Sequence, residues 1–128
     1  MDFALLEEHR LLQDTVRRFV RQELLPLEPL VLQLDTQGMT GEDLLPNDVE
    51  ERLLAKAKEV GLWGLDVPEE FGGLNLGALP KCLANEELHK TITPFTFPPD
   101  APNLHMLMQT CTPEQREKYL LLFRELVW

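Results

Sequence analysis

Three histidines, His9, His89 and His105, are the side chains best suited to acid–base or metal chemistry near neutral pH, and they lie far apart along the chain. His9 falls on the apolar face of a predicted helix, where a hydrogen-bonded structural histidine is more common than a catalytic one. His89 ends another predicted helix, where a cation interacts favourably with the helix dipole. His105, in a short methionine-rich helix, is the one left open for a functional role.

Glu86 is a second candidate, because on a predicted helix it follows Leu83 by three residues and Cys82 by four, close to the centre of the apolar face. A buried carboxylate needs a partner. Two roles are open. One is an ion pair with Arg17 or Arg18 of the first predicted helix, which is the more common outcome. The other is an acid or base with a shifted pKa.

Other catalytic and metal-binding patterns are absent from the sequence. Cys82 and Cys111 form no CxxC pair and have no neighbouring pair of histidines, so we expect neither a zinc site nor a disulfide. No GxSxG, HExxH, phosphate-binding loop or GxGxxG motif occurs. The sequence therefore predicts no metal and no self-contained catalytic centre.

Composition limits the class of protein further. The chain has 128 residues, 44% of them hydrophobic, which is enough for one compact domain. Its formal net charge of −10 opposes binding to nucleic acid or to an anionic membrane surface, and no apolar run has the roughly 20 residues needed to span a bilayer. The N-terminal residues lack a signal or transit pattern. We therefore expect a cytoplasmic location, or a mitochondrial one if a presequence was removed.

Hydrophobic spacing predicts an all-α domain with a bundle of about five to six helices. The first helix is expected from about residue 2 to 24, capped by Asp2 and ended by Pro26. Residues 26–46 are expected to form a connector, with 28–34 as a helical turn or a continuation of the first helix. A second helix should start at Asn47 or Asp48 and end at Gly61, which suits a left-handed cap. The first helix's apolar face is Leu5, His9, Leu12, Val16 and Phe19.

The second half of the chain alternates loops and helices. Residues 61–73 combine glycines with large apolar residues and predict an ordered, half-buried loop, anchored by Trp63 and Phe71. A third helix is expected from 77 to about 90, an irregular stretch over 91–102, and a short helix over 104–108. The last helix should be capped by Thr112 and start at Pro113, and Gln115, three positions after the cap, predicts a capping box.

Two runs resemble the N-terminal domain of the acyl-CoA dehydrogenases. Residues 60–76, VGLWGLDVPEEFGGLNL, are followed by the Asn-Glu-Glu-Leu of residues 85–88. The similarity continues upstream in Phe19 to Pro26, the Arg-Phe-Val to Leu-Pro end of the first helix. Downstream it continues in Asn103-Leu104 and in Thr112 to Leu120, which resembles the family's Glu-Gln-Lys to Tyr-Leu helix. The resemblance therefore covers essentially the whole chain.

The resemblance implies a subunit of three domains, of which residues 1–128 are the first, with the middle β-domain and the C-terminal helical domain absent. It implies α,β-dehydrogenation of an acyl-CoA substrate, FAD as the cofactor and an electron-accepting flavoprotein as the partner. In most members the glutamate base lies in the C-terminal domain. We therefore assign no catalytic residue in this chain, and expect it to be inactive and unable to retain FAD by itself. Glu86 and Glu87 match a structural motif of the family.

The same resemblance gives the chain one wall of the acyl-chain cavity, through the segment between the Glu-Glu-Leu helix and the next helix. This sequence departs from the family there, because prolines replace what is a smoother helix in many members. The departing prolines are Pro98, Pro99 and Pro102. The positions that align with cavity-lining residues are Phe97, Asp100, Ala101 and Leu104.

Two functions remain open. The first is the N-terminal domain of a flavin-dependent acyl-CoA dehydrogenase, contributing scaffold and part of the cavity wall. The alternative is a stand-alone helical protein-interaction module that has lost catalysis. Apolar residues 120–123 wrap around more than one face of the last helix, so we expect a homo-oligomer or self-association through exposed apolar surface.

Overall fold

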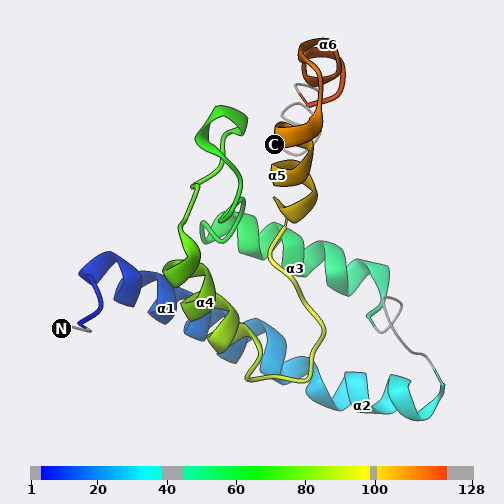
Figure 1. The fold of residues 1–128 in the computed structure, drawn as a ribbon. Helices are drawn as coiled ribbons and strands as arrows, with labels where there is room; N and C mark the ends of the chain where they lie inside the picture. Colours follow the sequence, from blue (N-terminus) through cyan, green and yellow to red (C-terminus); the bar gives the residue numbers. More distant parts are fainter. Residues whose placement is uncertain (1–3, 39–44, 99–100, 121–128) are drawn as a thin grey trace. The chain divides into compact units, whose positions relative to one another are not determined.

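The computed structural model describes residues 4–38, 45–98 and 101–120, excluding the side chains of 101–103. The regular elements among these residues are helices, and no strand is present among them, which confirms the predicted all-α class (Figure 1). The chain divides into two compact units, which are described separately. Unit 1 is 1–62 with 78–96, and unit 2 is 63–77 with 97–128. That residues 1–128 form one domain of the family stays a prediction.

Unit 1 begins with a helical path that changes its hydrogen-bond register twice. Its segments are α1 (Glu7–Phe19), a π-helical turn (Val20–Leu24), a 3-10 turn (Leu25–Leu27) and α2 (Glu28–Thr36). The break expected at Pro26 is wrong: the helical path changes register after Leu24 and continues, because Pro26 lies in the first turn of the 3-10 segment, where an N–H has no partner within the helix. The alternative, a continuation of the first helix through 28–34, is confirmed. α1 starts after Leu6, which provides no side-chain cap; Asp2 lies outside the described residues.

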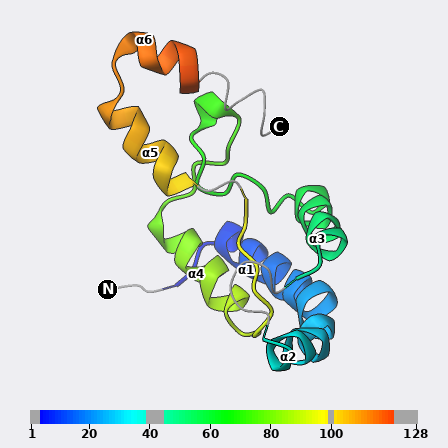
Figure 2. The same cartoon turned by 90° about the vertical axis from the view of Figure 1, so that its right-hand side faces the viewer.

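The core of unit 1 forms where α1 packs against α4 (Ala78–Leu88), and the two helices lie side by side in both views (Figures 1 and 2). α1 buries Val16 and Phe19 on this side. The Phe19 ring also packs against that of Phe95, with ring centroids 5.3 Å apart. The apolar face predicted for the first helix is confirmed at these buried positions.

α3 (Asn47–Glu59) completes unit 1. Its N-cap is Pro46, without a side-chain hydrogen bond, so the predicted cap at Asn47 or Asp48 is wrong. Its end is as expected: Gly61 has φ 80, and the Leu62 N–H donates to the Ala57 carbonyl at 2.8 Å. This is the Schellman arrangement, in which a glycine accepts the left-handed conformation at no steric cost.

Unit 2 contains a short 3-10 turn (Glu69–Phe71), α5 (Ala101–Thr110), α6 (Pro113–Gln115) and a π-helical turn (Arg116–Leu120). α5 is longer than the predicted 104–108. The predicted capping box is confirmed, since Thr112 and Gln115 each bond the other's backbone N–H. In the predicted self-association surface, Leu120 is 2% exposed, and 121–123 lie outside the described residues. Self-association stays a prediction.

Candidate functional site

The glycine-rich loop of residues 63–77 belongs to unit 2 and folds back on itself (Figure 1). Its two arms are joined by backbone hydrogen bonds, including Leu74 N–H to Gly64 O at 2.9 Å and Leu76 N–H to Leu65 O at 2.8 Å. At the tip, a Cβ on Gly73 would collide with the backbone and side chain of Val67. Position 73 therefore needs glycine because the two arms approach too closely for any side chain.

A buried cluster joins this loop to the helices of unit 2. Phe71, 1% exposed, packs with Val67 of the same loop and with Leu104 and Leu120 of the helical part. Met108 and Cys111 pack against the cluster from α5 and its C-terminal end. The predicted burial of Phe71 is confirmed, whereas Trp63 is half-buried.

The four positions predicted to line an acyl cavity fall in unit 2. Phe97 is half-buried, and Leu104 is 2% exposed within the cluster. Ala101 is the first residue of α5, and neither its side chain nor Asp100 belongs to the described part of the structure. The cavity-lining role of these four positions stays a prediction.

Among the described residues, hydrogen bonds connect Pro98 and His105, which lie near these positions, to the glycine-rich loop. The Gly64 N–H donates to the Pro98 carbonyl at 2.9 Å. His105 Nε2 lies 2.8 Å from the Asp66 carbonyl oxygen. Residues 98 and 105 are therefore held by loop residues only two positions apart.

The contact of His105 with a carbonyl also shows that its Nε2 is the donor. A carbonyl oxygen can only accept a hydrogen bond, so Nε2 must carry a proton. The carboxylate of Asp66 is a further neighbour, with Oδ1 3.6 Å from Nε2. The imidazole is 40% exposed. His105, the histidine that the sequence left open, thus joins α5 to the glycine-rich loop.

Unit 1 contains a buried carboxylate, and it is Glu87 rather than Glu86. Glu87 is 2% exposed, whereas Glu86 is exposed. The Arg17 guanidinium donates from Nε and Nη2 to the two Glu87 oxygens, at 3.3 and 2.9 Å, and Lys90 Nζ donates at 2.9 Å. The hydrogen bond from Arg17 lowers the pKa of Glu87, and that from Lys90 adds to this effect against the opposing effect of burial.

The prediction for Glu86 was wrong by one helix position, although Arg17 was correctly named as a possible partner. The predicted apolar face of this helix contained Cys82, but Cys82 is exposed. The buried face of α4 instead has helical spacing through Pro80, Leu83, Ala84, Glu87 and Leu88. Both oxygens of Glu87 are occupied by cations, so this network stabilises the α1–α4 contact and leaves no carboxylate ready to accept a proton from a substrate.

The other two histidines have local surroundings. His89 follows α4, and its Nδ1 donates to the Asn85 carbonyl of that helix at 2.8 Å. His9 is 16% exposed, and its Nε2 lies 3.9 Å from Glu8 Oε1. Within the described residues the buried His9 Nδ1 has no hydrogen-bond partner, so the bonding expected for it is not seen there.

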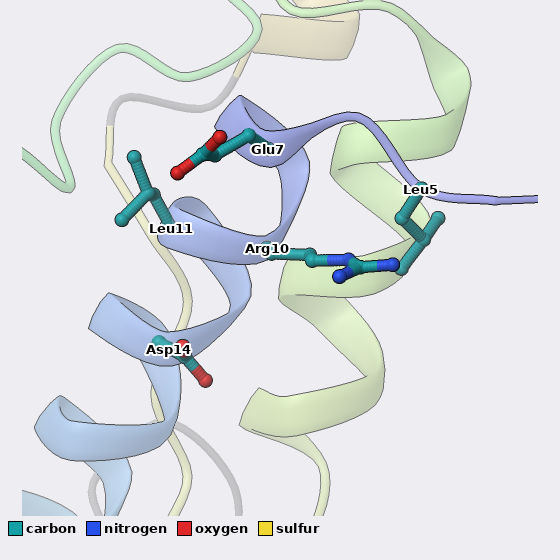
Figure 3. Close-up of a pocket in the computed structure, with 5 residues that line it drawn as sticks. All are labelled: Leu5, Glu7, Arg10, Leu11 and Asp14. Atoms are coloured by element: carbon teal, nitrogen blue, oxygen red, sulfur yellow. The ribbon is translucent and has the colours of Figure 1, made fainter.

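An open hollow of about 470 Å³ lies on the N-terminal part of unit 1 (Figure 3). Figure 3 shows Arg10 extending towards Leu5, with Glu7 on the other side of α1 in this view. Leu11 and Asp14 complete the lining. The lining contains two exposed carboxylates, Glu7 and Asp14, and one guanidinium, Arg10, so its net negative charge does not fit the anionic pyrophosphate of FAD.

Within the described residues, no group of three or more His, Cys, Asp or Glu side chains is placed to hold a metal ion. None of the helices in this part of the chain is both long and apolar enough to cross a membrane.

Comparison with known proteins gives a consistent result. Residues 6–123 match the family described as "Acyl-CoA dehydrogenase, N-terminal domain". The chain is 42% identical over 126 residues to (R)-benzylsuccinyl-CoA dehydrogenase of Thauera aromatica, an alignment covering 94% of this chain and 31% of that protein. It is 30% identical over 125 residues to acryloyl-CoA reductase (NADH) of Anaerotignum propionicum, covering 94% and 28%.

A solved structure, titled as the electron transferring flavoprotein of Acidaminococcus fermentans and concerned with flavin-based electron bifurcation, is similar with a TM-score of 0.58 and 27% identity. The match covers 98% of this chain and 30% of that one. The chain therefore spans less than a third of the length of the relatives described above.

Proposed function

Because this chain belongs to the acyl-CoA dehydrogenase N-terminal domain family, we propose that it is the N-terminal domain of a flavin-dependent enzyme that oxidises an acyl-CoA thioester between its α and β carbons. The observation that carries this function is the family match over residues 6–123, supported by 42% identity to a benzylsuccinyl-CoA dehydrogenase along 94% of the chain. The family match and the alignment with this relative each extend over most of the chain, so the similarity is not confined to one helix.

In this function the chain supplies scaffold and part of the acyl-binding surface. The Glu87 network joins α1 to α4, and the buried cluster of unit 2 joins the glycine-rich loop to α5. We assign the cavity wall to Phe97, Asp100, Ala101 and Leu104. The cofactor is proposed to be FAD, held with the catalytic base by the remainder of the enzyme, and the electron acceptor to be an electron-transferring flavoprotein.

The activity is tested by purifying the complete enzyme that carries this chain and measuring dye reduction with a series of acyl-CoA thioesters. The series should include benzylsuccinyl-CoA, because a relative is named for it. Reduction of the dye by at least one thioester, with bound flavin, supports the function. A protein that binds no flavin and oxidises none of them would instead favour the stand-alone interaction module.

The cavity wall is tested by changing side-chain bulk on α5 in the same enzyme. Ala101→Leu and Leu104→Val should change the preference among acyl groups, measured as kcat/KM across the series, while flavin content stays constant. Gln109→Ala, at an exposed position of the same helix, is the matched control. An unchanged preference in both Ala101→Leu and Leu104→Val would remove these residues from the cavity.

A further inference from the structure

Helix α2 has more apolar side chains than unit 1 buries. Its sequence, EPLVLQLDT, has aliphatic residues at positions 30, 31, 32 and 34. Only Val31 of this helix is buried, and Leu32 is 56% exposed. A helix that is apolar around most of its circumference normally lies in a protein interior. The exposed face of α2 is therefore a candidate interface.

Two further exposed aliphatic side chains extend this face. Leu25 is 37% exposed in the 3-10 turn before α2, and Ile92 is 54% exposed in the chain that follows α4. Both are tied to Glu28, because the Glu28 N–H donates to the Leu25 carbonyl and the Ile92 N–H donates to Glu28 Oε1 at 3.2 Å. Leu32 lies one helical turn beyond Glu28. These three aliphatic residues and Glu28 form the Glu28 patch.

The Glu28 carboxylate is oriented, but it has no cationic partner among the described residues. Its Oε1 accepts from Thr91 Oγ1 at 2.8 Å and from the Ile92 N–H, and both of these donors are neutral. Within the described part of the chain, no Lys or Arg pairs with Glu28. Residues 39–44, which follow α2 in the sequence, include no Lys, Arg or His. An oriented carboxylate with aliphatic neighbours suits a lysine or arginine that is itself flanked by apolar side chains.

The charge of the chain and the length of its relatives favour one occupant for this patch. Two copies of a chain with net charge −10 repel each other, and an anionic membrane surface repels the chain in the same way. The matched region is 31% of one relative's length and 28% of another's. In the function proposed above, the rest of the enzyme is covalently joined to this chain, so it meets the patch at a high effective concentration.

We propose that the Glu28 patch is the docking site for the remainder of the same polypeptide, which covers Leu25, Leu32 and Ile92 with apolar side chains and pairs Glu28 with a lysine or arginine. This inference rests on the function proposed above, because it requires the chain to be one domain of a longer enzyme. It assigns the patch no contact with substrate or flavin.

A photoreactive side chain in the complete enzyme tests which surface covers the patch. Benzoylphenylalanine in place of Leu32 should, after irradiation and digestion, be joined to peptides from outside residues 1–128, while the protein keeps its single-chain mass on a denaturing gel. The same side chain in place of Glu51, exposed on α3, is the matched control and should cross-link with a much lower yield. A band of twice the mass would identify a second copy. That band, equal yields at the two positions, or no cross-link would each overturn the proposal.

A charge substitution tests the pairing of Glu28. Glu28→Gln removes the charge but keeps an oxygen that can accept from Thr91 and Ile92. In the complete enzyme, backbone hydrogen exchange of peptides from residues 25–36 should be about fivefold faster in this variant, the size expected for one ion pair near the surface. Glu51→Gln should exchange like the wild type, and added salt should bring the wild type closer to Glu28→Gln. Equal exchange in Glu28→Gln and the wild type would overturn the pairing.

The docking inference and the proposed function can fail separately. If the complete enzyme binds flavin and oxidises a thioester, but position 32 gives no cross-link within the polypeptide, the docking inference fails and the function stands. If the complete protein oxidises no thioester, the function fails. A cross-link from position 32 to the same polypeptide would then still support docking at the Glu28 patch.

Discussion

Folding removes the Glu87 carboxylate from water and surrounds it with donors that lie partly in solvent. Arg17 is 37% exposed and Lys90 is 54% exposed, compared with 2% for Glu87. The two cations therefore retain part of their hydration while their bonds offset the desolvation of the acid. This asymmetry is favourable, because the main penalty of a buried ion pair comes from removing both charges from water.

Replacing Glu87 by glutamine should reduce the free energy of unfolding by about 1–3 kcal/mol, because hydrogen bonds to a charged group contribute in this range. Glu86→Gln, one position away on the exposed side of α4, should change it by less than about 0.5 kcal/mol. Thermal melts of both variants measure the difference. Equal midpoints would contradict the assignment of Glu87 as the residue that stabilises this contact.

The stabilisation by Glu87 should depend on pH. Its pKa in the folded state is lowered chiefly by the hydrogen bond from Arg17, so the folded protein binds a proton less readily than the unfolded chain. The contribution is complete above the ordinary glutamate pKa of about 4.3 and is lost as pH falls through the lower folded value. Urea unfolding of wild type and Glu87→Gln should differ most near pH 7 and converge in acid. A constant difference down to pH 3 would contradict this sign.

The sequence was sufficient to predict a buried glutamate on this helix and Arg17 as a possible partner, but it did not identify which glutamate. Two adjacent acids differ by about 100° around a helix, and the choice between them depends on which neighbours face the core. The predicted apolar face included Cys82, which is exposed, and that shifted the predicted buried face by one position. The partner's location on α1, 70 positions away, decides the register.

At the scale of elements, the glycine-rich loop depends on one close approach. Gly73→Ala should destabilise unit 2 by about 2–4 kcal/mol, because a Cβ there would meet the Val67 backbone, which cannot move aside. Gly77→Ala is the control, since nothing lies within 4 Å of a Cβ at that position. Thermal melts should show a lower midpoint for Gly73→Ala alone, and similar midpoints for both would show that the loop adapts.

Of the two aromatic residues in the same loop, Phe71 should contribute more to stability than Trp63. Phe71→Ala removes a ring that is 1% exposed and should cost about 3–5 kcal/mol, whereas Trp63→Ala should cost less because the indole is half-buried. Tyr119→Ala, with the side chain 58% exposed, is the control for loss of an aromatic ring. An unchanged midpoint for both Phe71→Ala and Trp63→Ala would exclude them as anchors.

Local signals in the sequence predicted the ends of several elements, and long-range contacts decided the rest. The left-handed Gly61 and the capping box at Thr112 depend on neighbours within a few residues, so they could be predicted. The continuation of the helical path through Pro26 could not be predicted from neighbouring residues. There the Leu24 carbonyl accepts from Thr93 Oγ1 at 2.8 Å, 69 positions later along the chain. That hydroxyl pairs a carbonyl where the helix changes register, which the local sequence does not reveal.

At the scale of the whole molecule, the chain matches relatives that are about three times as long. The sequence therefore predicted only the part of the site that this chain contributes. The sequence indicated the family and the segment aligned with an acyl cavity. It left His105 open, because the role of that ring depends on the Asp66 carbonyl, 39 positions earlier. Histidine beside a backbone acceptor has no local sequence pattern.

The isolated chain 1–128 should fold as a helical protein yet neither retain FAD nor oxidise acyl-CoA. Folding follows from the buried core of each unit, whereas hydride transfer needs a cofactor that no side chain replaces. Purified 1–128, mixed with FAD, would be examined by circular dichroism, by flavin absorbance after desalting and by dye reduction, with the complete enzyme as the control. Sedimentation would show whether exposed apolar residues such as Met106 and Leu74 cause self-association. Stoichiometric flavin retention, or dye reduction that requires substrate, would show that the chain is a self-sufficient enzyme and overturn its assignment as one domain of a larger one.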